Sequence, residues 1–130
     1  MEILLALFCG LRKGEIAGLK FGDFDVETRT IYIQRQITSN PVVSKGGSEI
    51  QSYEVIEKPP KTDNSYRRLR IPEAIAEEIE KRRAVVEANK LQYGEQYFDH
   101  DYISCQENGL PHSMAAMNGV LTRLCARNGL

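Results

Sequence analysis

The sequence contains no tryptophan, only two histidines and only three cysteines among its 130 residues. The cysteines, Cys9, Cys105 and Cys125, are odd in number and show no Cys-x-x-Cys spacing. This usage argues against a disulfide framework and a thiolate metal site, and it fits reduced thiols in a cytoplasm. The histidines, His100 and His112, do not have metal-ligand spacing. We therefore expect a cytoplasmic chain without a metal centre.

The sequence also lacks a long hydrophobic run and an excess of charge of either sign. The apolar stretch at residues 3–9 is far shorter than the roughly 18 residues of a membrane span, and no basic leader precedes it. Charged residues make up 27% of the chain, and the formal net charge is −1. Neither a membrane partner nor disorder is indicated, and binding to nucleic acid would require a local concentration of basic residues.

The length and the hydrophobic content of 42% are sufficient for one domain with a buried core, so we interpret residues 1–130 as a single unit. The first apolar segment begins at residue 1 without a capping residue before it. At the other end, Gly129 can terminate a helix, and only Leu130 follows. We therefore expect a domain that is truncated at both ends.

Hydrophobic periodicity predicts four helices. The first, at residues 1–9, is apolar almost all round and is expected in a core. A short helix follows at residues 13–19, and a long helix begins after Pro72 and ends near residue 93. Ser113 is expected to cap the last helix, which carries a core-facing stripe of Met117, Val120, Leu121 and Leu124.

Alternating side chains predict three strands. Residues 29–37 form a half-buried strand with Ile31, Ile33 and Ile37 on one face. Asn40-Pro41 and Gly46-Gly47-Ser48 mark a mobile excursion, after which residues 53–56 give a weaker second strand. Residues 66–71 form the third. The predicted fold is therefore α+β, mainly helical, with one small three-stranded antiparallel sheet.

Positive charge is concentrated in residues 58–70. This segment, read as a hairpin, contains five basic side chains and the single acid Asp63, so the rest of the chain is acidic overall. Alternation places two of the arginines on the face opposite Leu69 and Ile71. A basic hairpin can hold a phosphate backbone, and Lys58, Lys61, Arg68 and Arg70 are the candidate DNA-binding residues. From charge alone, the hairpin can also be interpreted as a solvated one whose charges protect a sheet edge.

A second group of polar residues lies between two apolar helical segments, in Gly10-Leu11-Arg12-Lys13-Gly14-Glu15. Arg12 and Glu15 are three residues apart and can share a helix face. In isolation the pair is compatible with a surface salt bridge at a helix start, which contributes about 0 to 1 kcal/mol.

Taken together, the two segments resemble the tyrosine recombinase (phage integrase) family. The first resembles the first box of the family, and the Asp23-Phe24-Asp25 turn follows it. The second is similar to the hairpin signature of the family, through Pro60-Lys61-Thr62, Ser65, Arg67-Arg68 and Ile71-Pro72. The resemblance covers essentially the whole chain, and it implies the front part of a recombinase catalytic domain.

The resemblance also implies roles for individual residues. Arg12 would be the first active-site arginine, which binds the scissile phosphate, and Lys61 the hairpin lysine, which can protonate the leaving 5′ oxygen. Glu15 would support the site without contacting the phosphate itself. The parent would act on double-stranded DNA through a 3′-phosphotyrosine intermediate, together with other recombinase subunits in a synaptic complex, and without a metal or nucleotide cofactor.

The printed sequence does not contain every part of that active site. Neither His100 nor His112 has an arginine three positions later, so the His-x-x-Arg box of the family is absent. None of the six tyrosines lies where the family places its nucleophile. We therefore expect the chain alone to be inactive. Three alternatives stay open: a non-catalytic DNA-binding remnant of an integrase, an α+β interaction module with a merely soluble hairpin, and a relative of type IB topoisomerases.

Overall fold

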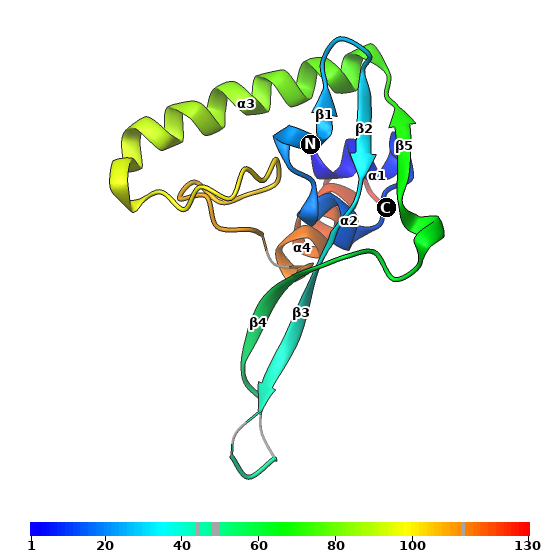
Figure 1. The fold of residues 1–130 in the computed structure, drawn as a ribbon. Helices are drawn as coiled ribbons and strands as arrows, with labels where there is room; N and C mark the ends of the chain where they lie inside the picture. Colours follow the sequence, from blue (N-terminus) through cyan, green and yellow to red (C-terminus); the bar gives the residue numbers. More distant parts are fainter. Residues whose placement is uncertain (44, 48–49, 113) are drawn as a thin grey trace.

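The computed structural model describes residues 1–43, 45–47, 50–112 and 114–130. Its elements follow one another as α1 (Glu2–Cys9), α2 (Lys13–Gly18), η1 (Phe21–Asp23), β1 (Phe24–Asp25), β2 (Thr30–Ile33), β3 (Gln36–Val43), β4 (Ile50–Lys58), η2 (Asp63–Ser65), β5 (Arg67–Arg70), α3 (Glu73–Tyr93), η3 (Gly94–Gln96) and α4 (Met114–Arg127). Figure 1 shows a body of helices and sheet, from which β3 and β4 extend as a two-stranded arm. The predicted α+β class is confirmed.

A three-stranded antiparallel sheet lies in the body, in the order β1-β2-β5. Ile31 and Ile33 of β2 are buried, as the alternation predicted, and Ile31 lies opposite Leu69 of β5. Residues 23–25, predicted as a turn, instead end the 3-10 helix η1 and form the short strand β1. The sheet packs on a core to which the helices contribute Leu5, Ile16, Ile75, Ile79 and Val86.

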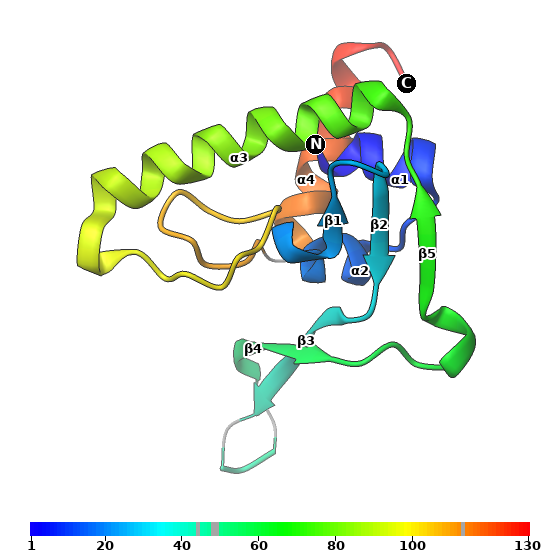
Figure 2. The ribbon, with the colours of Figure 1, turned by 45° about the horizontal axis from the view of Figure 1, so that its top comes forward.

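The second predicted strand does not join this sheet, which is a correction to the predicted topology. Strand β4 is longer than residues 53–56, and it pairs antiparallel with β3. Strand β3 continues through Asn40 and Pro41, where the sequence predicted an excursion. Ser48, which belonged to the same prediction, lies outside the described residues. The pairing of β3 with β4 forms the arm, which points away from the body in both ribbon views (Figures 1 and 2).

Side chains at the base of the arm explain why the chain changes direction there. The predicted strand at residues 29–37 breaks at Gln34 and Arg35, between β2 and β3. Both side chains turn to the buried Asp23: the Gln34 amide donates to Oδ1 at 2.5 Å, and the Arg35 guanidinium pairs with Oδ2. On the other strand, Pro59 and Pro60 have no N–H to donate, so they end the pairing of β4.

The long helix α3 begins at Glu73, directly after Pro72, as predicted. Its buried residues, Ile75, Ala76, Ile79 and Val86, recur on the face that meets the core. Within the described residues, no helix combines the length and the apolar character needed to cross a bilayer.

Two predictions of burial were wrong. In α1 only Leu5 is fully buried, while Leu7 and Phe8 are 74% and 65% exposed. In α4 the stripe of Val120, Leu121 and Leu124 is also exposed rather than core-facing. The periodicity identified the apolar faces correctly, but α1 and α4 lie on either side of a cavity of about 470 Å³ instead of closing on each other. The Met117 side chain and the predicted cap Ser113 lie outside the described residues.

Candidate functional site

The first turn of α2 presents Arg12 to solvent. Gly10 ends α1 in the left-handed region, at φ 66°, and the chain then reverses into α2. Arg12 is the N-cap residue of α2, with an extended backbone and an exposed side chain. Its backbone N–H donates to Glu15 Oε2 at 2.9 Å, so the carboxylate satisfies one of the free N–H groups at the helix start.

Glu15 is buried, with 3% of its surface exposed, and it pairs with an arginine from another element. The Arg67 guanidinium, on β5, donates from Nη1 to Oε1 at 2.9 Å and from Nη2 to Oε2 at 3.0 Å. Burial by itself raises the pKa of the Glu15 carboxyl, but the hydrogen bonds from Arg67 and Arg12 and their charges bring the pKa below its usual value. The interpretation of Arg12 and Glu15 as a surface salt bridge, which the sequence in isolation allowed, was wrong, because Glu15 is buried and Arg12 donates to it through the backbone N–H.

Lys61 lies on the connection between β4 and β5, in residues 59–66, which we call the lysine loop. The side chain is exposed. The loop is ordered by a tight turn at η2, where Ser65 N–H donates to Thr62 O at 3.0 Å and the two hydroxyls lie 2.9 Å apart.

Both ends of the lysine loop are fixed close to α2. At one end the Gln36 amide donates to Pro59 O at 3.4 Å. Gln36 lies against Gly14 of α2, where an added Cβ would be 3.5 Å from the Gln36 Cβ. At the other end Arg67 binds both Ser65 O, at 3.1 Å, and Glu15. Since Lys61 is two positions after Pro59, their Cα atoms lie within about 7 Å of each other. The loop is therefore held beside the helix turn that Arg12 begins.

The other predicted DNA-binding residues are also exposed. Lys58 ends β4, and Arg68 and Arg70 alternate with the half-buried Leu69 on β5, as predicted. Arg68 lies over the ring of Tyr32, with its guanidinium carbon 5.4 Å from the ring centroid. The basic segment is not a hairpin, however, because β5 pairs with β2 and β4 pairs with β3.

Arg67 is the residue of this site that sequence reasoning did not assign. Its position on β5 places it on the same face as Leu69, and a charged side chain on the inner face of a strand requires a partner. The position of Arg67 on the same face as Leu69 was the feature of the sequence that could have identified it. The partner, Glu15, lies 52 residues earlier and could not be identified from spacing.

Among the residues that the structure describes, no group of three His, Cys, Asp or Glu side chains could hold a metal ion. Cys9, Cys105 and Cys125 are free thiols. The charged groups of the site are thus arginine and lysine cations around one buried carboxylate, an arrangement suited to binding a phosphate diester.

No protein-family model matches this chain. A curated protein, the tyrosine recombinase XerC-like protein of Caldanaerobacter subterraneus subsp. tengcongensis, is 35% identical over 96 residues, which are 74% of this chain and 24% of that protein. Among solved structures, the Tn1549 transposon integrase in complex with circular intermediate DNA has a TM-score of 0.68 at 20% identity, covering 98% of this chain and 37% of that chain. The same integrase in complex with transposon right end DNA has a TM-score of 0.68 at 21% identity, covering 97% and 36%.

The chain thus spans about a quarter of the length of the curated relative and just over a third of the structural neighbours. The identity extends over three quarters of the chain, including at least part of the segment between Arg12 and Lys61, since a 96-residue match in 130 residues must include the middle of the chain. The shared fold extends over nearly all of it. The match to the curated relative places this chain in the tyrosine recombinase family, and the solved structures show that it shares their fold over part of their length.

Proposed function

We propose that this chain supplies two cations to the active site of a site-specific DNA recombinase. Arg12 binds a non-bridging oxygen of the scissile phosphate, and Lys61 protonates the 5′ oxygen that leaves. Glu15 supports the start of α2 from behind. The proposal rests on the placement of the lysine loop beside the first turn of α2, because one phosphate can then contact both side chains.

The chemistry explains why these two residue types are suitable. A tyrosine hydroxyl attacks the phosphorus, the bond to the 5′ oxygen breaks, and the DNA remains joined to the protein through a 3′-phosphotyrosine ester. Charge builds up on the non-bridging oxygens during the attack, and a planar guanidinium that is always charged matches their geometry. The departing alkoxide needs a proton, which an ammonium group can supply.

The sequence contains no His-x-x-Arg box, and we assign none of its six tyrosines as the attacking residue. The complete reaction therefore belongs to a longer protein that contains this segment, and the 130 residues alone leave DNA intact. In that protein we assign double-stranded DNA as the substrate, other recombinase subunits as partners in the synaptic complex, and no cofactor.

DNA binding in this proposal depends on the exposed cations around the site. Lys58 lies three residues before Lys61, and Arg68 and Arg70 lie on the solvent face of β5, beyond the lysine loop. Contacts of this kind neutralise backbone phosphates and position the duplex without reading its sequence. Both solved structures cited above are complexes of an integrase with DNA, which agrees with this assignment.

The proposal is tested with the full-length protein and a nicked duplex that carries the joined ends of the element encoding it. Cleavage next to the nick releases a short strand and traps the covalent complex, which is counted on a denaturing gel. We expect Arg12→Ala to slow trapping by about 10³- to 10⁵-fold at saturating DNA. Lys61→Ala should slow it by about 10²- to 10⁴-fold.

A substrate with sulfur in place of the 5′ bridging oxygen separates the two roles. A thiolate leaves without protonation, so this substrate should restore most of the rate of Lys61→Ala and none of the rate of Arg12→Ala. Unchanged trapping in Arg12→Ala, or a Lys61→Ala defect that sulfur does not relieve, would contradict the assigned roles.

A further inference from the structure

We propose that Arg67 is a positioning residue for DNA cleavage: by binding the buried Glu15 with two nitrogens, it holds the lysine loop at a fixed place relative to Arg12. This inference rests on the function proposed above. It adds a residue that contacts neither the phosphate nor the leaving group.

The hydrogen bonds of one carboxylate connect the two halves of the site. Glu15 Oε2 accepts from the Arg12 backbone N–H at 2.9 Å and from Arg67 Nη2 at 3.0 Å. Arg67 Nη1 donates to Glu15 Oε1 at 2.9 Å and to Ser65 O, in the lysine loop, at 3.1 Å. A continuous path of hydrogen bonds therefore runs from the backbone of Arg12 to the backbone of the loop that carries Lys61.

Arg67 is the firmer of the two anchors of the lysine loop. The contact at the other end, from the Gln36 amide to Pro59 O, is 3.4 Å long and lies on the surface. The Arg67 contacts are shorter, and they are made to a charged group that is almost completely buried. Loss of the Arg67 side chain would leave this end of the loop attached only through the backbone pairing of β5 with β2.

Burial of Glu15 makes the pairing obligatory. A buried carboxylate without a charged partner is unfavourable, so the Arg67 guanidinium is held against Glu15 in the folded chain. Arginine is suited to this role because its planar fork fixes direction as well as distance, whereas the ammonium of lysine is a point charge that does not fix the direction.

The inference predicts that Arg67→Ala slows the chemical step in the same way as the loss of a proton donor. A displacement of a catalytic group by about 1 Å can lower a rate by about 10²-fold. We expect Arg67→Ala to slow single-turnover cleavage of the nicked duplex by about that factor while the Kd for the same DNA stays near the wild-type value. Because the displaced group is Lys61, the substrate with bridging sulfur should recover much of the loss.

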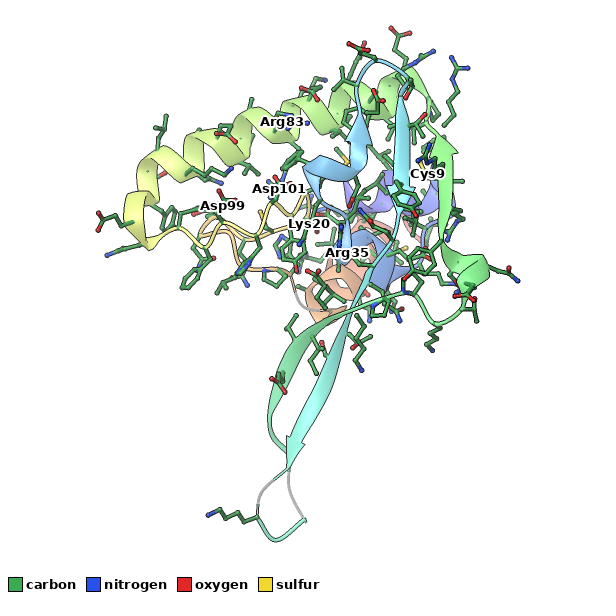
Figure 3. All side chains as sticks on the ribbon, in the orientation of Figure 1. Cys9, Lys20, Arg35, Arg83, Asp99 and Asp101 are labelled. Carbon is green, nitrogen blue, oxygen red and sulfur yellow. The ribbon has the colours of Figure 1, made fainter. Side chains whose placement is uncertain are left out.

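Two variants accompany this measurement. Arg67→Lys keeps the charge but loses the second hydrogen bond, and it should fall between wild type and Arg67→Ala with oxygen and close to wild type with sulfur. Arg83→Ala is the matched control: its side chain is 37% exposed against 31% for Arg67, and it pairs with Glu80 on α3, away from the site (Figure 3). Arg83→Ala should cleave the oxygen substrate and the sulfur substrate at the wild-type rates.

The outcomes separate this inference from the proposed function. If Lys61→Ala is not relieved by sulfur, the proposed role of the lysine fails. If sulfur relieves Lys61→Ala while Arg67→Ala is equally slow with both substrates, or as fast as wild type with oxygen, the positioning role is wrong and the proposed function stands. Circular dichroism reports folding, and if Arg67→Ala is unfolded, equal oxygen and sulfur defects in the folded Arg67→Lys overturn the inference.

Discussion

The hydroxyl of Tyr102 donates a hydrogen bond to Glu57 Oε2 at 2.5 Å, and so joins the segment after α3 to the base of the arm. Lys20 Nζ lies 3.2 Å from the same oxygen, and Arg35 Nε lies 3.6 Å from the other. Figure 3 places Lys20 and Arg35 where the arm leaves the body. Burial and the bond to Glu57 both raise the pKa of the Tyr102 hydroxyl, so it remains a donor at physiological pH.

Replacing Tyr102 with phenylalanine tests this junction. The ring is buried and would stay in place, while Glu57 would keep its two cationic partners and its access to water. We expect Tyr102→Phe to lower the free energy of unfolding by about 1 kcal/mol, as for the loss of one hydrogen bond near the surface. Urea denaturation followed by circular dichroism measures the difference. A value within error of zero would show that the two cations alone hold the arm.

The Glu15–Arg67 pair predicts a dependence of stability on pH. The pKa of Glu15 is lowered in the folded chain from the ordinary value of 4.5, so the charged carboxylate contributes stability above that value. The contribution disappears as the pH falls through the lower, folded pKa. At pH 7 we expect Glu15→Gln to be less stable than wild type by about 1 to 3 kcal/mol.

The measurement is a series of urea titrations of both proteins between pH 7 and pH 3. Other carboxyls with lowered pKa values, such as Glu2 and Glu57, occur in both proteins and cancel in the difference. The gap between the two curves should be constant down to about pH 5 and then close. A gap that does not change with pH would mean that the Glu15 carboxylate is not stabilised by the fold.

Duplex DNA binding by this chain should depend on the outer face of β5. Non-specific complexes have Kd values of about 10⁻⁴ to 10⁻⁶ M at physiological salt, and the acidic remainder of the chain can only weaken binding. Arg68→Ala/Arg70→Ala should bind more weakly and should lower the slope of log K against log salt by roughly 0.9 for each lost phosphate contact. Neither side chain fills the core, so the fold should be retained.

Lys81→Ala/Arg83→Ala removes the same charge from α3 and serves as the control, because both side chains pair with glutamates of that helix. Its salt slope should stay at the wild-type value. If the β5 variant also keeps the wild-type affinity and slope, its arginines are solvated charges on a sheet, as the alternative interpretation of the basic segment holds.

Gly109 should tolerate no side chain. Its φ is +89°, and a Cβ there would lie 2.2 Å from the carbonyl oxygen of Phe98, whose N–H is bonded to Asn108. Gly109→Ala combines a backbone strain of about 1–3 kcal/mol with a clash against a hydrogen-bonded backbone. Gly47→Ala has the strain alone, since its φ is +73° and no described atom lies within 4 Å of its Cβ. Thermal denaturation should rank Gly109→Ala well below Gly47→Ala.

The local features of the fold could be predicted from sequence because they depend on nearby residues. Periodicity located α1, α2 and α3, and alternation placed Ile31 and Ile33 inside and Arg68 and Arg70 outside. The partner of each strand could not be predicted in this way. Pairing β5 with β2 rather than β4 depends on the side chains at the base of the arm, which bind Asp23 from another part of the chain.

The same limit applies to the site. Resemblance to a family indicated Arg12, Lys61 and Glu15, but nothing in the spacing joined Arg67 to Glu15, because the bond closes a loop of 52 residues. The exposed stripe of α4 has a different cause. Periodicity identifies which face of a helix is apolar, but it cannot tell what covers that face.

The way in which the arm is attached to the body allows the length of the arm to change. Its two strands pair only with each other among the named strands, and Arg35 and Glu57 fix its root. Residues inserted or deleted in matched pairs along β3 and β4 would preserve the alternation of faces and leave the register of β2 with β5 unchanged. Evolution could therefore lengthen or shorten this projection without disturbing the geometry around Arg12 and Lys61, as hairpin ends generally tolerate insertion.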